Sequence, residues 1–248
     1  MTRHAIVTGA SRGIGRAIAL GLANRGYNLA LTDIAAQQGA LLETVAEVEK
    51  LGRQCLPVLA DVSQIDDCRR TVSEAVAGLG HIDVLVNNAG ILRLANIDET
   101  TPEHWDQTFA VNVRGVFLMT QAVVVHMKER RYGRIVNIAS LAARTGGPGQ
   151  SHYAASKSAV VGFTRVSSME FGGDGITVNA VCPGIILTEM GRNNLQSPER
   201  VAYFEKITDL HRLGQPEDVV GPVAFFASDD SAFVTGQALN VDGGIFYS

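Results

Sequence analysis

The fold is decided near the N-terminus by the stretch Ala5-Ile6-Val7-Thr8-Gly9-Ala10-Ser11-Arg12-Gly13-Ile14-Gly15. Its first four residues form a short β-branched run, which is typical of a strand. Glycines interrupt this run, and an amphipathic helical pattern follows as far as Gly26. A second apolar run, residues 29–32, then ends at Asp33. A strand, a glycine-rich turn, a helix and a strand that ends in an acid predict the first half of a dinucleotide-binding fold.

The glycine-rich turn predicts where a dinucleotide binds. One glycine permits the turn, one lets the backbone approach a pyrophosphate, and one lets helix and strand pack closely. The phosphates would lie at the helix N-terminus, where free N–H groups and the helix dipole favour anions. We therefore expect the cofactor to contact this turn through Gly9, Ser11, Arg12, Gly13, Ile14 and Gly15.

Asp33 predicts which dinucleotide is used. It lies 18 residues beyond Gly15, close to the ~20 expected for the acid that binds the adenine ribose. A carboxylate there accepts hydrogen bonds from the 2′-hydroxyl and repels a 2′-phosphate. Arg12 acts in the opposite direction, since a guanidinium in this turn could meet a 2′-phosphate. Giving Asp33 the greater weight predicts NAD as the cofactor; its alternative role is that of a helix N-cap.

Composition narrows the class of protein. With 248 residues, 46% hydrophobic and 19% charged, the chain has the composition of a soluble globular protein. A net charge of -4 provides no basic field for nucleic acid, and no Lys/Arg block suggests a membrane surface. We find no signal-peptide pattern, and the apolar runs are shorter than a membrane span. The scattered cysteines, Cys55, Cys68 and Cys182, fit a reducing compartment. We expect a cytoplasmic protein with a small-molecule substrate and no metal.

Strands and helices alternate along the rest of the chain. Further strands are expected at residues 54–60, 82–86, 135–139, 176–181 and 237–244, and helices at 35–51, 65–79, 102–127, from Tyr153 onward, and 216–226. Pro57 places its strand at a sheet edge, because proline cannot donate to a ladder. Residues 185–200 are interpreted as a mobile loop. The pattern predicts an α/β fold, with a single doubly wound Rossmann domain over residues 1–248 and a mostly parallel, seven-stranded sheet.

Several strand ends carry candidate site residues. Asp61 and Val62 follow one strand and are expected to contact the adenine. Asn88-Ala89-Gly90 follow another, where small residues let a loop pass close to a ligand. Asn112 lies inside a predicted helix, where asparagine is disfavoured, so it either bonds locally or serves the site.

Tyr153 and Lys157 are the candidate acid/base pair. Residues i and i+4 of a helix share a face, so the phenol and the ammonium project into one volume. A nearby cation favours the phenolate and lowers the tyrosine pKa from ~10. Ser140 ends the preceding strand and could donate a hydrogen bond to the reacting oxygen. Taken alone, the pair could equally be a surface lysine beside an interfacial tyrosine.

These motifs together resemble one family. In order and spacing, the chain resembles the short-chain dehydrogenase/reductase family over its whole length, through Thr8-Gly9-x3-Gly13-x-Gly15, Asn87-Asn88-Ala89-Gly90, Asn112, Ser140, Tyr153-x3-Lys157 and Pro183-Gly184. The resemblance implies hydride transfer between nicotinamide C4 and a carbonyl or carbinol carbon. It also implies a homotetramer, for which the apolar segment 238–247 offers a surface.

The resemblance implies a role for each residue. Tyr153 would be the acid/base, and Ser140 would orient the substrate oxygen. Lys157 would hold the nicotinamide ribose and lower the pKa of Tyr153, and Asn112 would hold a water in a proton relay. The cofactor would also contact Pro183, Gly184, Ile186 and Thr188, the last through the carboxamide.

The substrate is open within this family. The best-known similar enzymes reduce 3-oxoacyl groups on acyl carrier protein with NADPH. Asp33 departs from that pattern, as does Asp174, which stands where such reductases tend to carry a basic residue. Small hydroxy compounds, sugars or polyols are therefore favoured, with Gln150, His152 and residues 185–196 near the pocket. His152 either bonds a polar substrate or is a bystander. A regulatory protein that binds NAD without chemistry is the alternative of another class, although Ser140, Tyr153 and Lys157 are all present.

Overall fold

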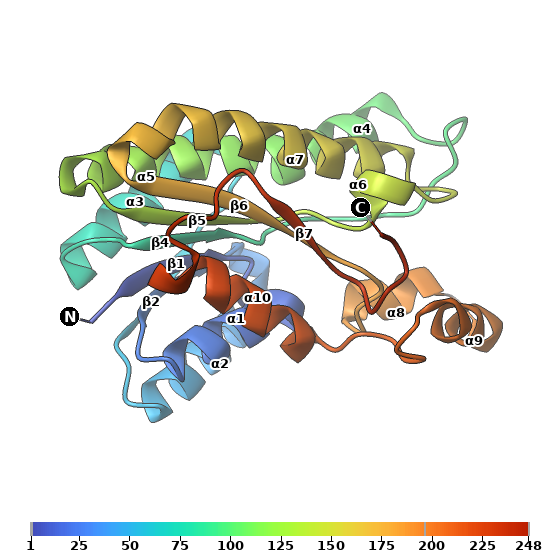
Figure 1. Ribbon diagram of the computed structural model, residues 1–248, viewed down its shortest axis with the longest axis horizontal. Helices are drawn as coiled ribbons and strands as arrows, with labels where there is room; N and C mark the ends of the chain where they lie inside the picture. Colours follow the sequence, from blue (N-terminus) through green and yellow to red (C-terminus); the bar gives the residue numbers. More distant parts are fainter. Residues whose placement is uncertain (1, 196, 248) are drawn as a thin grey trace.

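The structure of the protein is a computed structural model that describes residues 2–195 and 197–247. Its strands form one seven-stranded sheet in the order β3-β2-β1-β4-β5-β6-β7 (Figure 1). Every neighbouring pair in this sheet is parallel. The strands are β1 (His4–Thr8), β2 (Asn28–Asp33), β3 (Cys55–Leu59), β4 (Val84–Asn87), β5 (Gly133–Ile138), β6 (Ile176–Pro183) and β7 (Ala238–Val241). The predicted fold class is confirmed, and the sheet is fully rather than mostly parallel.

The strand order reverses next to β1. This strand pairs with β2 on one side, through His4 and Asn28, and with β4 on the other, through Ala5 and Val84. The chain therefore winds outward in one direction from β1 to β3, and in the other from β4 to β7. In such sheets the loops at the carboxyl ends diverge at this switch point and leave a crevice for a ligand.

Helices bury both faces of the sheet (Figure 1). One face packs against α1 (Gly13–Ala23), α2 (Gln38–Lys50) and α10 (Pro216–Phe226), and the other against α3 (Ile65–Leu79), α5 (Gly115–Arg130) and α7 (Ser151–Phe171). Strand residues alternate between the two layers, since Ala5 and Val7 belong to the first core and Ile6 to the second. Burial on both sides explains why these strands are continuous apolar runs.

The β3 edge confirms a prediction made from proline. Leu31 of β2 pairs with Pro57 of β3, which is the last strand on that side. The missing N–H of Pro57 therefore costs no ladder bond within the sheet.

The predicted long helix before β5 is interrupted. It consists of α4 (Pro102–Phe109), a π-helical turn η2 (Ala110–Arg114) and α5. Such turns often occur at functional sites, and Asn112 lies inside this one. The combined helix, Pro102–Arg130, is long and apolar enough to cross a membrane by length and composition, and 50% of its most apolar window is buried in the protein. Core helices of globular proteins meet the same criteria.

The interpretation of residues 185–200 as a mobile loop is wrong. They contain α8 (Glu189–Leu195) and the start of α9 (Pro198–Ile207). Ser197 caps α9 by accepting a hydrogen bond from the Arg200 N–H, and Pro198 occupies the first turn. These residues are a recognisable helix start. The remaining short helices are η1 (Ala35–Gln37), α6 (Ala142–Thr145), η3 (Gly172–Asp174) and η4 (Asp229–Ser231).

Candidate active site

A cavity of about 1500 Å³ lies where the carboxyl ends of the strands meet the segment that follows β6. Its volume exceeds the ~300–1,000 Å³ of a typical single-ligand site, so it has room for a dinucleotide and a substrate. Most of the predicted site residues line it, namely Gly9, Arg12, Gly13, Ile14, Gly15, Asp33, Asp61, Val62, Asn88, Ala89, Gly90, Ser140, Tyr153, Lys157, Pro183, Gly184, Ile186 and Thr188. Ser11 and Asn112 are buried and do not line it.

The glycine-rich loop, residues 9–15, requires glycine for space as well as conformation. Gly9 and Gly13 have φ values of 63° and 54°, which side chains disfavour. A Cβ on Gly15 would lie 2.0 Å from the Gly9 carbonyl oxygen. The Asn88 amide donates to the carbonyls of Thr8 and Gly9, each at 2.9 Å. The loop is thereby fixed with the N-terminus of α1 at the cavity, as anion binding requires.

Asp33 lies at the end of β2 against this loop. Its Oδ2 accepts hydrogen bonds from the Ser11 hydroxyl at 2.6 Å and the Ser11 N–H at 3.2 Å. Its Oδ1 accepts one from the Ile34 N–H at 2.9 Å. The 3-10 helix that follows has Ile34, not Asp33, as its N-cap, so the N-cap alternative is wrong. The hydroxyl of Ser11, a residue predicted to contact the cofactor, donates to Asp33.

The segment after β6 reaches back to the glycine-rich loop. The Arg12 guanidinium donates to the Glu189 carboxylate at the start of α8. A Cβ on Gly13 would lie 3.1 Å from Thr188 Cγ2. The Thr188 hydroxyl accepts a hydrogen bond from the Gly191 N–H at 3.0 Å. This segment and the glycine-rich loop therefore close one side of the cavity together.

Ser140, Tyr153 and Lys157 lie together on another wall of the cavity. Ser140 follows β5, and its hydroxyl accepts a hydrogen bond from the Ala142 N–H at 3.1 Å. Tyr153 and Lys157 lie one turn apart in α7, with Lys157 Nζ 5.8 Å from the centre of the Tyr153 ring. Lys157 Nζ also donates to the Ile138 carbonyl at 2.7 Å. The β5 end and α7 thus place a hydroxyl, a phenol and an ammonium side by side.

Burial controls the proton affinities of this group. It lowers the pKa of Lys157 from 10.5 to about 8, because an ammonium loses its hydration. It also raises the pKa of Tyr153, and hydrogen bonding to Ser140 lowers it by less. The sequence-based expectation that Lys157 lowers the pKa of Tyr153 is not met in this structure, where burial of the phenol dominates.

The Asn112 side chain is hydrogen-bonded to the start of the loop that follows β4. Its Oδ1 accepts from the Ile91 N–H at 2.8 Å, and its Nδ2 donates to the Ile91 carbonyl and to Ser156 Oγ, both at 3.0 Å. Its partners are 21 and 44 residues away in the chain, so Asn112 does not bond locally within its own helix, which was one of the two expectations. A Cβ on Gly90 would lie 3.3 Å from both Asn112 Oδ1 and Lys157 Nζ. Asn112 and Lys157 thus both lie close to Gly90, and Asn112 does not line the cavity.

Some cavity residues were not anticipated from the sequence. They come from α4, from the turn after Ser140 and from α9, and include Gln107, Leu141, Arg200, Tyr203 and Phe204. The Ser197-Pro198 helix start could have placed α9. His152 is the opposite case, because it is fully buried and lines no part of the cavity. Its suggested bond to a polar substrate is therefore excluded. Within the described ranges, no three potential metal ligands cluster.

Comparisons with known proteins agree with this geometry. The sequence profile of the family described as enoyl-(acyl carrier protein) reductase matches residues 9–246. A 3-oxoacyl-acyl-carrier-protein reductase from Staphylococcus epidermidis is 39% identical over 99% of this chain and 100% of its own. An L-rhamnose 1-dehydrogenase (NAD(P)(+)) from Sphingomonas sp. is 40% identical over 97% of this chain and 95% of its own. A solved structure provisionally described as an NAD(P)-dependent gluconate 5-dehydrogenase from Beutenbergia cavernae, with NADP at low occupancy, has a TM-score of 0.92 and 37% identity, and covers 98% of this chain and 96% of its own.

The fold and the cavity define an enzyme that uses a nicotinamide dinucleotide. The chain belongs to the short-chain dehydrogenase/reductase family, in the branch that resembles 3-oxoacyl-acyl-carrier-protein reductases. It is an oxidoreductase that transfers a hydride between the cofactor and a secondary alcohol or ketone.

Proposed function

We propose that Tyr153 is the acid/base of this oxidoreductase, with Ser140 and Lys157 as its partners. The observation that carries the proposal is the grouping of these three side chains on one wall of the cavity. When bound, the cofactor supplies or accepts the hydride. In the reducing direction, the Tyr153 hydroxyl gives its proton to the substrate oxygen, and in the oxidising direction it takes that proton back. Ser140 donates a hydrogen bond to the same oxygen, and Lys157 holds the ribose and supplies positive charge beside the phenolate.

Replacing the tyrosine tests this assignment. Tyr153→Phe keeps the ring and removes the transferable proton, so turnover should fall by ~10²–10⁴-fold. NADH affinity, measured by fluorescence titration, should change by less than twofold. A Tyr153→Phe enzyme with turnover near that of the wild type would overturn the assignment. An unaltered protein that binds NADH but turns over no alcohol, ketone or thioester would instead favour the regulatory alternative.

We propose further that NAD(H) is preferred over NADP(H). The Asp33 carboxylate lies on the cavity wall, and beyond its three hydrogen bonds it retains one lone pair, on Oδ1, for a ribose hydroxyl. Arg12, the cation that could meet a 2′-phosphate, is paired with Glu189. The NADP in the Beutenbergia structure shows that a similar fold binds the phosphorylated cofactor, so the preference must rest on these side chains.

The cofactor preference is measured as the ratio of kcat/KM for NADH and NADPH. Asp33→Asn removes the charge and keeps the shape, and it should reduce this ratio at least tenfold. Glu189→Gln tests the contribution of Arg12. It removes the carboxylate that pairs with the Arg12 guanidinium, so activity with NADPH should rise. A wild-type enzyme that prefers NADPH, or a ratio unmoved by Asp33→Asn, would refute the proposal.

For the substrate we propose a small hydroxy compound, sugar or polyol. Asp174 forms an ion pair with Lys128 at 3.4 Å, so the position where carrier-dependent reductases tend to be basic is neutralised here. The second candidate is a 3-oxoacyl group on acyl carrier protein, which the 39% identity to a reductase of that kind favours. A panel of secondary alcohols, polyols, sugars and 3-oxoacyl thioesters, followed by NADH and NADPH absorbance, separates the two.

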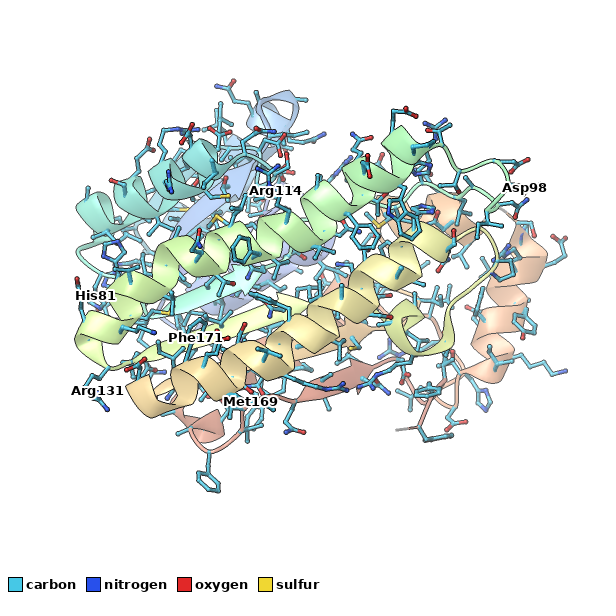
Figure 2. All side chains as sticks on the ribbon, turned by 90° about the horizontal axis from the view of Figure 1, so that it is seen from above. His81, Asp98, Arg114, Arg131, Met169 and Phe171 are labelled. Carbon is cyan, nitrogen blue, oxygen red and sulfur yellow. The ribbon has the colours of Figure 1, made fainter. Side chains whose placement is uncertain are left out.

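We also propose a cytoplasmic homotetramer in which the whole chain acts as one domain. A tetramer with two kinds of two-fold axis needs two separate self-complementary surfaces. One candidate surface is made by α5 and α7, which lie side by side across one face (Figure 2) and expose Phe117, Val125, Val166 and Met169. The other includes Leu239 at the sheet edge and Tyr247 near the C-terminus. Exposed apolar patches of this kind mark interfaces.

The two surfaces can be tested separately by light scattering. Met169→Glu and Leu239→Glu should each leave dimers, because each disrupts one surface and spares the other. The two together should leave monomers of 26.4 kDa. A wild-type monomer at micromolar concentration would contradict the proposal.

A further inference from the structure

His152 is a buried imidazole directly beside the proposed acid/base. It is the second residue of α7, has 0% exposure and precedes Tyr153. Its Nε2 lies 2.9 Å from the carbonyl oxygen of Arg93. A carbonyl oxygen can only accept a hydrogen bond, so Nε2 carries the proton and donates. The helix that bears Tyr153 is thereby bonded to the loop that contains Arg93.

The loop that receives this bond forms part of the cavity wall. Residues 91–101 form most of the connection from β4 to α4, which spans residues 88–101, and Ile91 and Leu92 line the cavity. Asn112 fixes the loop at Ile91. Two further bonds come from the segment just before Tyr153, one from His152 and one in which the Ala95 N–H donates to the Gly149 carbonyl at 3.0 Å. Hydrogen bonds therefore hold the loop that forms this part of the cavity wall to the segment that carries Tyr153.

The ring of His152 packs against a second imidazole, that of His104. The ring of His104, from α4, lies with its centre 4.3 Å from that of His152, at an angle of 53°. His152 Nδ1 and His104 Nε2 are both buried, and neither has a hydrogen-bond partner among the described residues. A neutral imidazole offers one donor and one acceptor, so with Nε2 donating to Arg93 the Nδ1 of His152 is the acceptor. Burial, and secondly His104, lower the pKa of His152, which keeps it a neutral donor.

We propose that His152 is a positioning residue that sets the separation between Tyr153 and the cavity wall at Ile91 and Leu92. The inference rests on the proposed role of Tyr153. Without the bond to Arg93, the loop 91–101 keeps its attachment at Asn112 but loses one of its two attachments to the Tyr153 segment. Substrate then sits less accurately against the phenol, and an error of about 1 Å can cost about 100-fold in rate. The glycine-rich loop lies in a different part of the chain and is unaffected.

Three variants of the full-length protein test the proposal. His152→Leu removes the donor and leaves the Arg93 carbonyl unpaired, whereas His152→Gln keeps a side-chain N–H for that carbonyl. Ser151→Ala is the matched control, since Ser151 is the neighbouring residue in α7 and its buried hydroxyl has no hydrogen-bond partner among the described residues. Hydrogen–deuterium exchange of residues 91–101 reports the anchor directly. Steady-state kinetics use the alcohol or ketone of the panel that the wild type turns over fastest, with the cofactor saturating.

In His152→Leu, amides of residues 91–101 should exchange at least tenfold faster, while those of residues 9–33 are unchanged. Its kcat/KM for the substrate should fall by about 10- to 100-fold, with less than a twofold change in NADH affinity. His152→Gln should restore both readouts to within about threefold of wild type, and Ser151→Ala should match wild type. If His152→Leu fails to fold, His152→Asn replaces it, because its shorter amide does not reach the carbonyl.

Other results would overturn the inference. Unchanged exchange at residues 91–101 in the donor-less variant would show that His152 does not anchor the loop. Equal losses in His152→Leu and His152→Gln would show that packing, not the hydrogen bond, matters. The outcome is separable from that of the proposed function. An inactive Tyr153→Phe beside a fully active His152→Leu refutes this inference alone, and an active Tyr153→Phe refutes the acid/base role whatever His152 does.

Discussion

Lys157 should make the unliganded enzyme less stable than an uncharged equivalent. Its side chain is 4% exposed and its pKa falls from 10.5 to about 8. One pKa unit corresponds to about 1.4 kcal/mol, so holding the ammonium in this position costs about 3 kcal/mol. The hydrogen bond from Nζ to the Ile138 carbonyl returns about 1 kcal/mol. Lys157→Met keeps the length of the side chain and removes the charge, and it should therefore raise the free energy of unfolding by about 2 kcal/mol at pH 7 while abolishing turnover.

The effect has a defined pH dependence. The unfolded lysine keeps its proton up to about pH 10.5, whereas the folded one loses it near pH 8. Between these values the unfolded state binds more protons, so the wild-type free energy of unfolding rises with pH. The Lys157→Met protein lacks this rise. Its advantage should therefore be full below pH 8, and should shrink through the window from pH 8 to 10.5 until only the lost hydrogen bond remains.

Urea denaturation of the cofactor-free proteins, followed by Trp105 fluorescence at pH 7, 9 and 10.5, measures the difference. Protein concentration must match, because assembly contributes to apparent stability. Groups distant from Lys157 titrate alike in both proteins and cancel. A Lys157→Met protein that is less stable at pH 7, or an advantage that does not change with pH, would refute the reasoning. Either result would mean that the lysine is hydrated or charge-paired in solution.

Further substitutions test the glycine-rich loop and the opposite end of the sheet. Gly15→Ala should abolish NADH binding in a fluorescence titration, because its Cβ would lie 2.0 Å from the Gly9 oxygen. Gly39→Ala, with no atom within 4 Å of the new Cβ, should instead leave binding intact and stabilise α2 by about 0.5–1 kcal/mol. The buried Asp83 carboxylate accepts hydrogen bonds from Arg130 at 2.7 Å and from the His4 N–H at 2.9 Å. Asp83→Asn removes its charge, so thermal denaturation should show a loss of about 2 kcal/mol in stability with kcat unchanged. An unchanged melting temperature would count against a stabilising ion pair.

Most of the fold could be predicted from local patterns in the sequence. The alternation of apolar runs with amphipathic segments marked the strands, and the expected helix bounds 65–79 and 216–226 coincide with α3 and α10. Pro57 correctly predicted an edge strand, because the effect of its missing N–H depends on that residue alone. Within residues 185–200, the Ser197-Pro198 pair is a local signal for the start of α9, so this helix could also be predicted from the sequence.

The parts of the site that could not be predicted depend on contacts between distant residues. Arg12 and Glu189 are 177 positions apart, and His152 and Arg93 are 59 apart. Neither periodicity nor a short motif encodes such a pair, since each partner alone has an ordinary local role. The π-helical turn around Asn112 is similar, because its side chain is held by Ile91 and Ser156. The position of the phenol and the ammonium was predictable from their spacing, whereas their proton affinities depended on how deeply the assembled fold buries them.

The unequal edges of the sheet limit how copies of the chain can meet. At the β3 edge, Pro57 withholds one of the donors that an added strand would need. At the β7 edge, Ala238–Val241 pairs with β6 on its inner side and has no further strand among the described residues. A β7 edge therefore cannot extend readily onto the β3 edge of the next copy. Head-to-tail growth of the sheet into a filament is therefore disfavoured. Association through β7 is limited to closed, two-fold pairing of two copies, so the exposed edge strand does not lead to polymerisation.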